Sequence, residues 1–281
     1  MTPFSLNIRG RLVNYRQPVV MGILNVTSDS FFPGSRCGSC SEVAERVRKM
    51  VEQGADIIDV GACSTRPGSE PVSADVELRR LETAMTALRS VAPEIPVSVD
   101  TFRADVAREA VNNLSADIIN DISGGSLDRD MFGTVADLKV PYILTHTRGT
   151  SANMGQLTDY GERGVTATVL DELGLKLNEL ALMGVNDIII DPGFGFAKTV
   201  SQNYTLMRDL AVFKQLRMPL LAGISRKSML TRPLGIEADD ALEPTVALNA
   251  FALDRGADIL RVHDVLPARQ SCTIYNLIHN S

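Results

Sequence analysis

Short apolar runs and longer amphipathic stretches alternate along the chain. Four of the apolar runs follow a proline, four follow a turn built from Gly, Ala, Asn or Asp, and the two kinds interleave strictly. Short runs rich in β-branched residues are typical of buried strands, where proline is allowed at the first position. The pattern predicts eight strands, at Val19–Asn25, Ile57–Gly61, Val97–Asp100, Ile118–Asp121, Tyr142–His146, Ile188–Asp191, Leu220–Ser225 and Ile259–His263.

Helical periodicity fills the gaps between these runs. In Asp75–Val91, apolar residues recur every three or four positions. The other predicted helices are Ser41–Gln53 with Ser41 as N-cap, Ala104–Asn113, Asp130–Asp137, Gly164–Met183, Ser201–Leu210, Glu243–Arg255 and Pro267–His279. This alternation implies a parallel sheet with helical crossovers. It predicts an α/β fold, a single-domain (β/α)8 TIM barrel over residues 18–281, with an open doubly wound sheet as the alternative. Residues 1–17 would be a short N-terminal extension, such as a hairpin.

Composition narrows the class of protein. The 281 residues are 44% hydrophobic and carry a net charge of −6, so a large core is available and no general attraction to nucleic acid is expected. No apolar run approaches the roughly 20 residues of a membrane span. The first 16 residues lack the apolar core of a signal peptide. We therefore expect a soluble cytoplasmic protein without nucleic-acid or membrane partners.

The predicted strands all carry polar residues at or near their C-terminal ends. The C-terminal ends carry Asn25, Asp59, Asp100, Asn120, Asp121, Thr145, His146, Asp191, the run Ser225–Ser228, and Arg261–Asp264. In a barrel of this kind the catalytic groups lie at those ends. Because side chains alternate along a strand, the residues expected to converge on one mouth are Asp100, Asn120, Asp191, Lys227, Arg261 and His263. Three long segments, 27–40, 62–74 and 147–163, would lie at the same end.

The charges at this mouth suggest two subsites. Carboxylates and an amide suit a ligand with several N–H groups, such as an aminopyrimidine ring, and Lys227 would donate to a ring carbonyl. Arg66, Arg261 and His263, together with Asn25, suit an anion such as phosphate. The pair Cys37 and Cys40 precedes a predicted helix. We interpret it as two thiols in a loop, with a redox role as the alternative, since no second pair completes a zinc site.

Seven short motifs resemble those of the dihydropteroate synthases. In chain order they are Met21–Phe31, Ser64–Gly68, Val99–Thr101, Ile119–Asp121, Asp191–Phe196, Ser225–Ser228 and Arg261–Asp264. The resemblance covers Val19 to Asp264. It implies a transferase of folate biosynthesis that joins 6-hydroxymethyl-7,8-dihydropterin diphosphate to p-aminobenzoate, giving 7,8-dihydropteroate and diphosphate. It also implies Mg2+ as cofactor, sulfonamides as inhibitors and a homodimer built from the late helices.

The resemblance implies a role for each matching residue. Asp100, Asn120, Asp191 and Lys227 would hold the pterin, with Arg261 stacked on its face. Asn25, Thr65, Arg66, Arg261 and His263 would bind diphosphate, with Asn25 acting through Mg2+. Phe31, Pro67, Lys227 and Ser228 would shape the p-aminobenzoate pocket. The expected catalytic groups are Asp100, Lys227, Arg261, Asp29 and Arg66.

Three positions depart from the usual motifs: Ser28 stands where Pro is common, Cys63 lies in a position where Glu is frequent, and Ala197 replaces a Gly. None removes a proposed ligand group, and they bear on loop dynamics and sulfonamide sensitivity. Two other readings stay open at this point, a pterin-dependent methyltransferase on the same barrel and a non-catalytic pterin-binding homologue.

Overall fold

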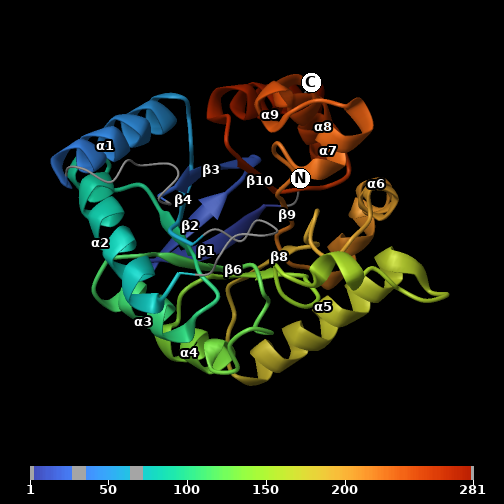
Figure 1. Cartoon of the computed structure of the whole chain (residues 1–281), viewed down its shortest axis with the longest axis horizontal. Coiled ribbons are helices and arrows are strands. Elements are labelled where there is room, and N and C mark those ends of the chain that lie inside the picture. Colours follow the sequence, from blue (N-terminus) through green and yellow to red (C-terminus); the bar gives the residue numbers. More distant parts are fainter. Residues whose placement is uncertain (1–2, 27–35, 64–71, 280–281) are drawn as a thin grey trace.

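A parallel eight-stranded sheet forms the centre of the computed structural model, which describes residues 3–26, 36–63 and 72–279 (Figure 1). Its order is β8-β7-β6-β5-β4-β3-β10-β9. A parallel bridge between Ile190 and Leu220 joins the two outer strands, and Ile190 N donates to Pro219 O at 2.9 Å. The sheet is therefore a nearly closed barrel. The predicted (β/α)8 barrel is confirmed, and the open sheet is wrong.

The strands lie close to their predicted positions. Their bounds are β3 Val19–Asn25, β4 Ile57–Gly61, β5 Val97–Asp100, β6 Ile118–Asp121, β7 Tyr142–Thr145, β8 Ile188–Asp191, β9 Leu221–Ala222 and β10 Ile259–Val262. One prediction was too long: β9 has two residues instead of the six of Leu220–Ser225. The chain turns away after Ala222, because Gly223 and the residues after it form the irregular segment that leads to the next helix.

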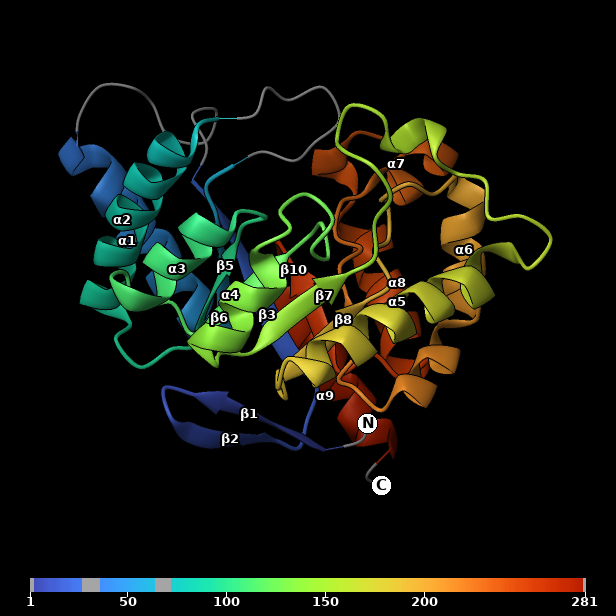
Figure 2. The ribbon, with the colours of Figure 1, turned by 90° about the horizontal axis from the view of Figure 1, so that it is seen from below.

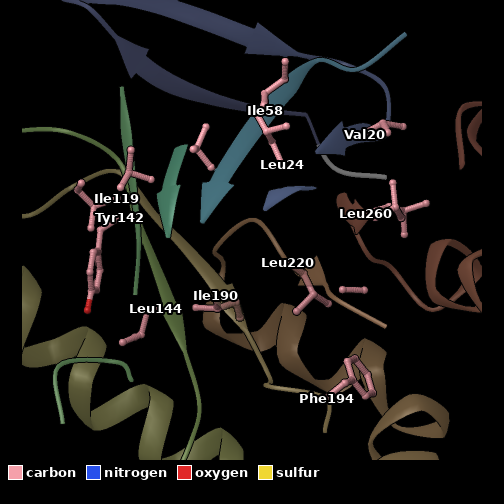
Figure 3. Close-up of a cluster of buried hydrophobic side chains, with 14 of the residues drawn as sticks. Val20, Leu24, Ile58, Ile119, Tyr142, Leu144, Ile190, Phe194, Leu220 and Leu260 are labelled. Carbon is pink, nitrogen blue, oxygen red and sulfur yellow. The ribbon is translucent and has the colours of Figure 1, made fainter. Parts of the chain in front are cut away.

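Helices cover the outside of the barrel. They are α1 Arg36–Glu52, α2 Ala74–Val91, α3 Ala104–Asn112, α4 Met131–Leu138, α5 Gly164–Leu182, α6 Val200–Arg208, α7 Ser228–Leu234, α8 Leu242–Asp254 and α9 Val265–His279. The outward-facing strand side chains, including Val20, Ile58 and Leu260, pack against them in one large cluster (Figure 3). Burial of this apolar surface is the main force that holds the helices to the sheet. Among the described residues no helix is both long and apolar enough to cross a membrane.

The N-terminal residues form an antiparallel hairpin under the barrel, β1 Phe4–Ile8 with β2 Arg11–Tyr15 (Figure 2). Leu6 and Ile8 are buried in the inner cluster together with Val19 and Ile259, the first residues of β3 and β10. The hairpin therefore covers the N-terminal end of the strands, and it leaves the C-terminal ends available for a site.

Helix α1 begins well before its predicted start. We expected Ser41 as an N-cap, but α1 starts at Arg36. Cys37 and Cys40 consequently lie within this helix, and the expectation of two thiols in a loop is wrong. The sequence around the pair, rich in Ser and Gly, has weak helix propensity. Packing of the later apolar residues such as Val43 and Val47 stabilises the helix as a whole.

Candidate functional site

Side chains that point into the barrel meet at the C-terminal ends of the strands. Arg261 on β10 lies between two carboxylates: its Nε donates to Asp59 Oδ2 at 2.6 Å, and its Nη2 donates to Asp100 Oδ2 at 2.6 Å. Asn120 Nδ2 donates to the same oxygen of Asp59 at 3.1 Å. The alternation that puts Ile57, Ile118 and Ile259 in the inner cluster puts these polar residues on the same side, two positions further on. The predicted convergence of Asp100, Asn120 and Arg261 therefore exists in the structure.

Asp191 and Lys227 form the neighbouring wall of this mouth. Both flank Gly223, where an added Cβ would lie 3.6 Å from Asp191 Oδ2 and 4.0 Å from Lys227 Nζ. Burial raises the pKa of Asp191, and Lys227 opposes this shift. Burial lowers the pKa of Lys227 to about 8, opposed by Asp191. The opposite charges of Asp191 and Lys227 stabilise each other. Both side chains still have polar atoms that can bind a ligand.

Burial also raises the pKa of Asp100, although the cation of Arg261 opposes this effect. A carboxyl that is partly desolvated beside a fixed guanidinium responds to the charge of whatever binds next to it. Clusters of perturbed ionisable groups in a cleft are typical of functional sites. In the described part of the mouth, four groups have a perturbed pKa: Asp100, Asp191, Lys227 and Arg261.

The glycine-rich turn after β8 holds Lys227 in place. Lys227 Nζ donates to Phe194 O and lies 4.5 Å from the centroid of the Phe196 ring. Gly195 has φ of +81°, and a Cβ there would lie 3.1 Å from Lys227 Cδ. Glycine is therefore required for this approach of the turn to the lysine. Ser228, the next predicted contact, is the first residue of α7.

His263, one of the predicted anion ligands, lies near Arg261. His263 follows the last residue of β10, and its Nδ1 lies 3.0 Å from Ser225 Oγ. Burial, and then the charge of Arg261, lower the pKa of His263 to about 4, so the ring is neutral at pH 7. His263 also lines a cavity of about 420 Å³ between α1 and the start of α9, whose charged lining is mixed: Arg46 and Lys49 with Glu42, Glu45 and Asp264.

Asn25 ends β3 next to this region, with its Oδ1 3.3 Å from the position of a Cβ on Gly61. An amide oxygen is a hard ligand of the kind Mg2+ accepts, and this ion usually keeps several waters and substrate phosphate oxygens. Within the described ranges no group of three His, Cys, Asp or Glu side chains could hold a metal. Asn25 is therefore chemically suited to contact such an ion.

Five predicted site residues fall outside the described residues: Asp29, Phe31, Thr65, Arg66 and Pro67. The departure at Ser28 does as well. The predictions for these positions remain predictions.

Some polar strand ends do not face the mouth. Asp121 points outward and accepts from Tyr142 Oη at 2.7 Å. Arg226 pairs with Asp264, with Nε to Oδ2 at 2.8 Å, and its Nη1 donates to Ala238 O at 2.9 Å. These residues position loops, which explains why a polar strand end alone does not identify a ligand group.

Sequence reasoning named Asp59 only as a residue of its strand, and it missed the central contact of Asp59 with Arg261. The signal was present, because Asp59 follows Ile57 by two positions and therefore shares its inward side. It also missed a buried network behind the glycine-rich turn, in which Lys198 contacts His146. No local pattern pointed to this contact, which joins two different connections of the barrel.

Comparison with known proteins places the chain among described enzymes. The profile of the family described as pterin binding enzyme matches residues 21–263. A dihydropteroate synthase from Synechocystis is 42% identical over 92% of this chain and 89% of its own length. A dihydropteroate synthase from Xanthomonas albilineans, solved with 4-aminobenzoic acid, has a TM-score of 0.89 and 34% identity over the full length of both chains. The Yersinia pestis enzyme, solved in a sulfonamide complex, has a TM-score of 0.89 and 32% identity, covering 99% of this chain and 100% of its own.

Proposed function

The chain belongs to the pterin-binding enzymes and among them to the dihydropteroate synthases, transferases of folate biosynthesis, and on that premise we propose how its barrel mouth performs the reaction. The reaction joins 6-hydroxymethyl-7,8-dihydropterin diphosphate to p-aminobenzoate and yields 7,8-dihydropteroate and diphosphate. The assignment of this site rests on the position of Arg261. Its guanidinium is fixed between Asp59 and Asp100 inside the barrel and is surrounded by acceptors. Neither a methyltransferase nor a binding-only homologue is favoured by any observation.

The pterin would lie on the inner polar groups. Asp100, Asn120 and Asp191 provide acceptors for its ring and amino N–H groups, and Lys227 donates to its carbonyl. Arg261 stacks on the ring face, a contact worth about 0.5–2 kcal/mol when desolvated. Because its guanidinium is held on two sides by carboxylates, it meets the ring without an additional loss of side-chain freedom.

The bond from the pterin methylene to the diphosphate oxygen breaks, and the electron pair leaves with diphosphate. The dihydropterin ring conjugates with the positive charge that develops on the methylene, and Asp100 and Asp191 stabilise that charge electrostatically. The aniline nitrogen of p-aminobenzoate then forms the new C–N bond and loses a proton to the departing diphosphate. The chain needs no covalent nucleophile for this sequence.

Arg261 and His263 would hold the leaving diphosphate, with Thr65 and Arg66 from the second loop. A neutral His263 donates one N–H to a phosphate oxygen while its Nδ1 lies against Ser225. Mg2+, when bound, neutralises part of the charge on the diphosphate, and Asn25 is the residue of this chain proposed to contact it. Asp29 would close over the site from the first loop.

Next to the pterin, p-aminobenzoate would occupy a pocket shaped by Phe31, Pro67, Lys227 and Ser228. Its carboxylate would lie near the backbone N–H groups around Ser228, at the start of α7. Sulfonamides resemble p-aminobenzoate in shape, so they would compete for this pocket. The sulfonamide complex of the Yersinia pestis enzyme supports the proposal.

Diphosphate release is the direct test. The purified chain is incubated with the pterin diphosphate, with and without p-aminobenzoate and Mg2+, and dihydropteroate is detected by mass spectrometry. We expect release that needs both additions, and Asp191→Asn should reduce it. Tight pterin binding without any release would overturn the synthase assignment in favour of a binding-only protein.

We also propose that the chain is a homodimer that forms through α8 and α9. Phe251, Ile274 and Leu277 are more than half exposed on these helices, and such apolar side chains are typical of interfaces. Light scattering of the wild type and of Phe251→Asp would test this, because a monomer in both would refute it. The cytoplasmic location stays an expectation from the sequence.

A further inference from the structure

Lys198 is a buried lysine behind the glycine-rich turn, and burial lowers the pKa of its amine to about 7. Its side chain lies between His146, which follows β7, and the turn, and the residue is 8% exposed. Its Nζ lies 2.9 Å from Gly193 O, 3.0 Å from Phe196 O and 3.0 Å from His146 Nδ1. Three acceptors match the three N–H donors of an ammonium group. Lys198 forms no ion pair with a described carboxylate, although the charge of Asp191 favours its protonated form from a longer distance.

The contact with His146 continues to the protein surface. His146 is 3% exposed, and burial lowers its pKa to about 4, so the ring is neutral. Because Nδ1 accepts from Lys198, Nε2 carries the ring proton and donates to Glu172 Oε2 at 2.8 Å. Glu172 on α5 also binds Arg148. The carboxylate of Glu172 therefore orients the imidazole of His146, which accepts a hydrogen bond from Lys198.

Lys198 and Lys227 bind the same glycine-rich turn through different carbonyl groups. Gly193 O and Phe196 O accept from Lys198, while Phe194 O accepts from Lys227 and the Phe196 ring lies against its ammonium group. The same turn therefore has one lysine on each side. A shift of the turn would move the acceptor and the ring that position Lys227.

We propose that Lys198, oriented by His146 and Glu172, is a positioning residue that sets the geometry of Lys227 in the pterin pocket. Lys198 contacts no substrate. It acts through the turn, and its removal leaves two buried carbonyls without their donor, which costs more than the loss of the hydrogen bonds themselves. This inference rests on the proposed contact between Lys227 and the pterin.

A double-mutant cycle on ligand binding tests the inference. The dissociation constant of pteroic acid is measured by calorimetry for the wild type, Lys198→Met, Lys227→Met and the double variant. We expect Lys198→Met to weaken binding about 10-fold, since small misplacements in a site have effects of this order or larger. In the Lys227→Met background the same change should have almost no further effect, because the group it positions is gone.

Lys176→Met is the matched control. Lys176 is also a partly buried lysine whose Nζ donates to a backbone carbonyl, Gly124 O at 2.7 Å, but on a different loop. This substitution should change the affinity for pteroic acid by no more than about twofold. Its effect on the binding free energy should add to that of Lys227→Met. Equal losses in both lysine variants would identify a general stability effect and overturn the proposal.

Glu172→Gln is a milder variant in case Lys198→Met does not fold. Glu172 is about one-third exposed, and the substitution keeps its shape while weakening its hold on His146. It should weaken binding in the same direction, about threefold, and only when Lys227 is present. Unchanged affinity in Glu172→Gln and Lys198→Met, with Lys227→Met impaired, would refute the positioning role alone. Unchanged affinity in Lys227→Met would refute both this role and the proposed pterin contact.

Discussion

The contact between Asp59 and Arg261 allows a sharp test of the site. Asp59 is fully buried, and its Oδ2 accepts from both Arg261 Nε and Asn120 Nδ2. Asp59→Asn keeps the size of the side chain and removes its charge. Loss of one partner of a buried ion pair costs about 3–5 kcal/mol. Because Asp100 still compensates the guanidinium, we expect the lower end of this range, about 3 kcal/mol of unfolding free energy.

Two assays measure the consequences. Urea unfolding reports the stability, and steady-state diphosphate release reports kcat/KM for the pterin substrate. We expect kcat/KM to fall about 10- to 100-fold, because Arg261 loses one of the two groups that hold it against the pterin. Asp239→Asn is the control: this fully exposed carboxylate lies 3.7 Å from Arg226, and exposed pairs of this kind often contribute nothing measurable. If Asp59→Asn matched Asp239→Asn in both assays, the central role of this ion pair would be wrong.

Two further substitutions probe the turn and the hairpin by urea unfolding. Gly193→Ala should destabilise the protein by more than about 2 kcal/mol, because φ is +72° and the new Cβ would meet a backbone oxygen at 1.9 Å. Gly161→Ala is the control, since its φ is +59° and no atom lies within 4 Å of the new Cβ. It should show only the backbone strain of about 1–2 kcal/mol. Equal losses would show that the close contact does not matter. Leu6→Ala should cost about 2–5 kcal/mol by leaving a cavity under the barrel, while Leu12→Ala, at 68% exposure, should change little. Turnover per folded molecule should stay normal in Leu6→Ala, and a specific loss of activity would contradict the separation of the hairpin from the site.

Much of the fold follows from local patterns. Proline and Gly-Ala-Asp turns separate short apolar runs, and these features depend on neighbouring residues only, so seven of the predicted strands match the structure within a residue. The β9 prediction failed because Leu220–Ser225 looks like a strand locally, whereas the barrel pairs only Leu221 and Ala222 with β10. The start of α1 failed for a similar reason: Ser41 resembles an N-cap, but the helix continues before it.

Local patterns along the chain are enough to predict which groups reach the mouth. Parallel strands bring their C-terminal ends together, and alternation sends Asp100, Asn120 and Arg261 to the same side. The contacts that pair these groups with one another depend on the tertiary fold. Arg261 meets Asp59 across 202 positions of the chain, and Lys198 meets His146 across 52. Such contacts depend on barrel closure and on the direction of side chains in irregular turns, and no periodicity along the chain encodes either of these.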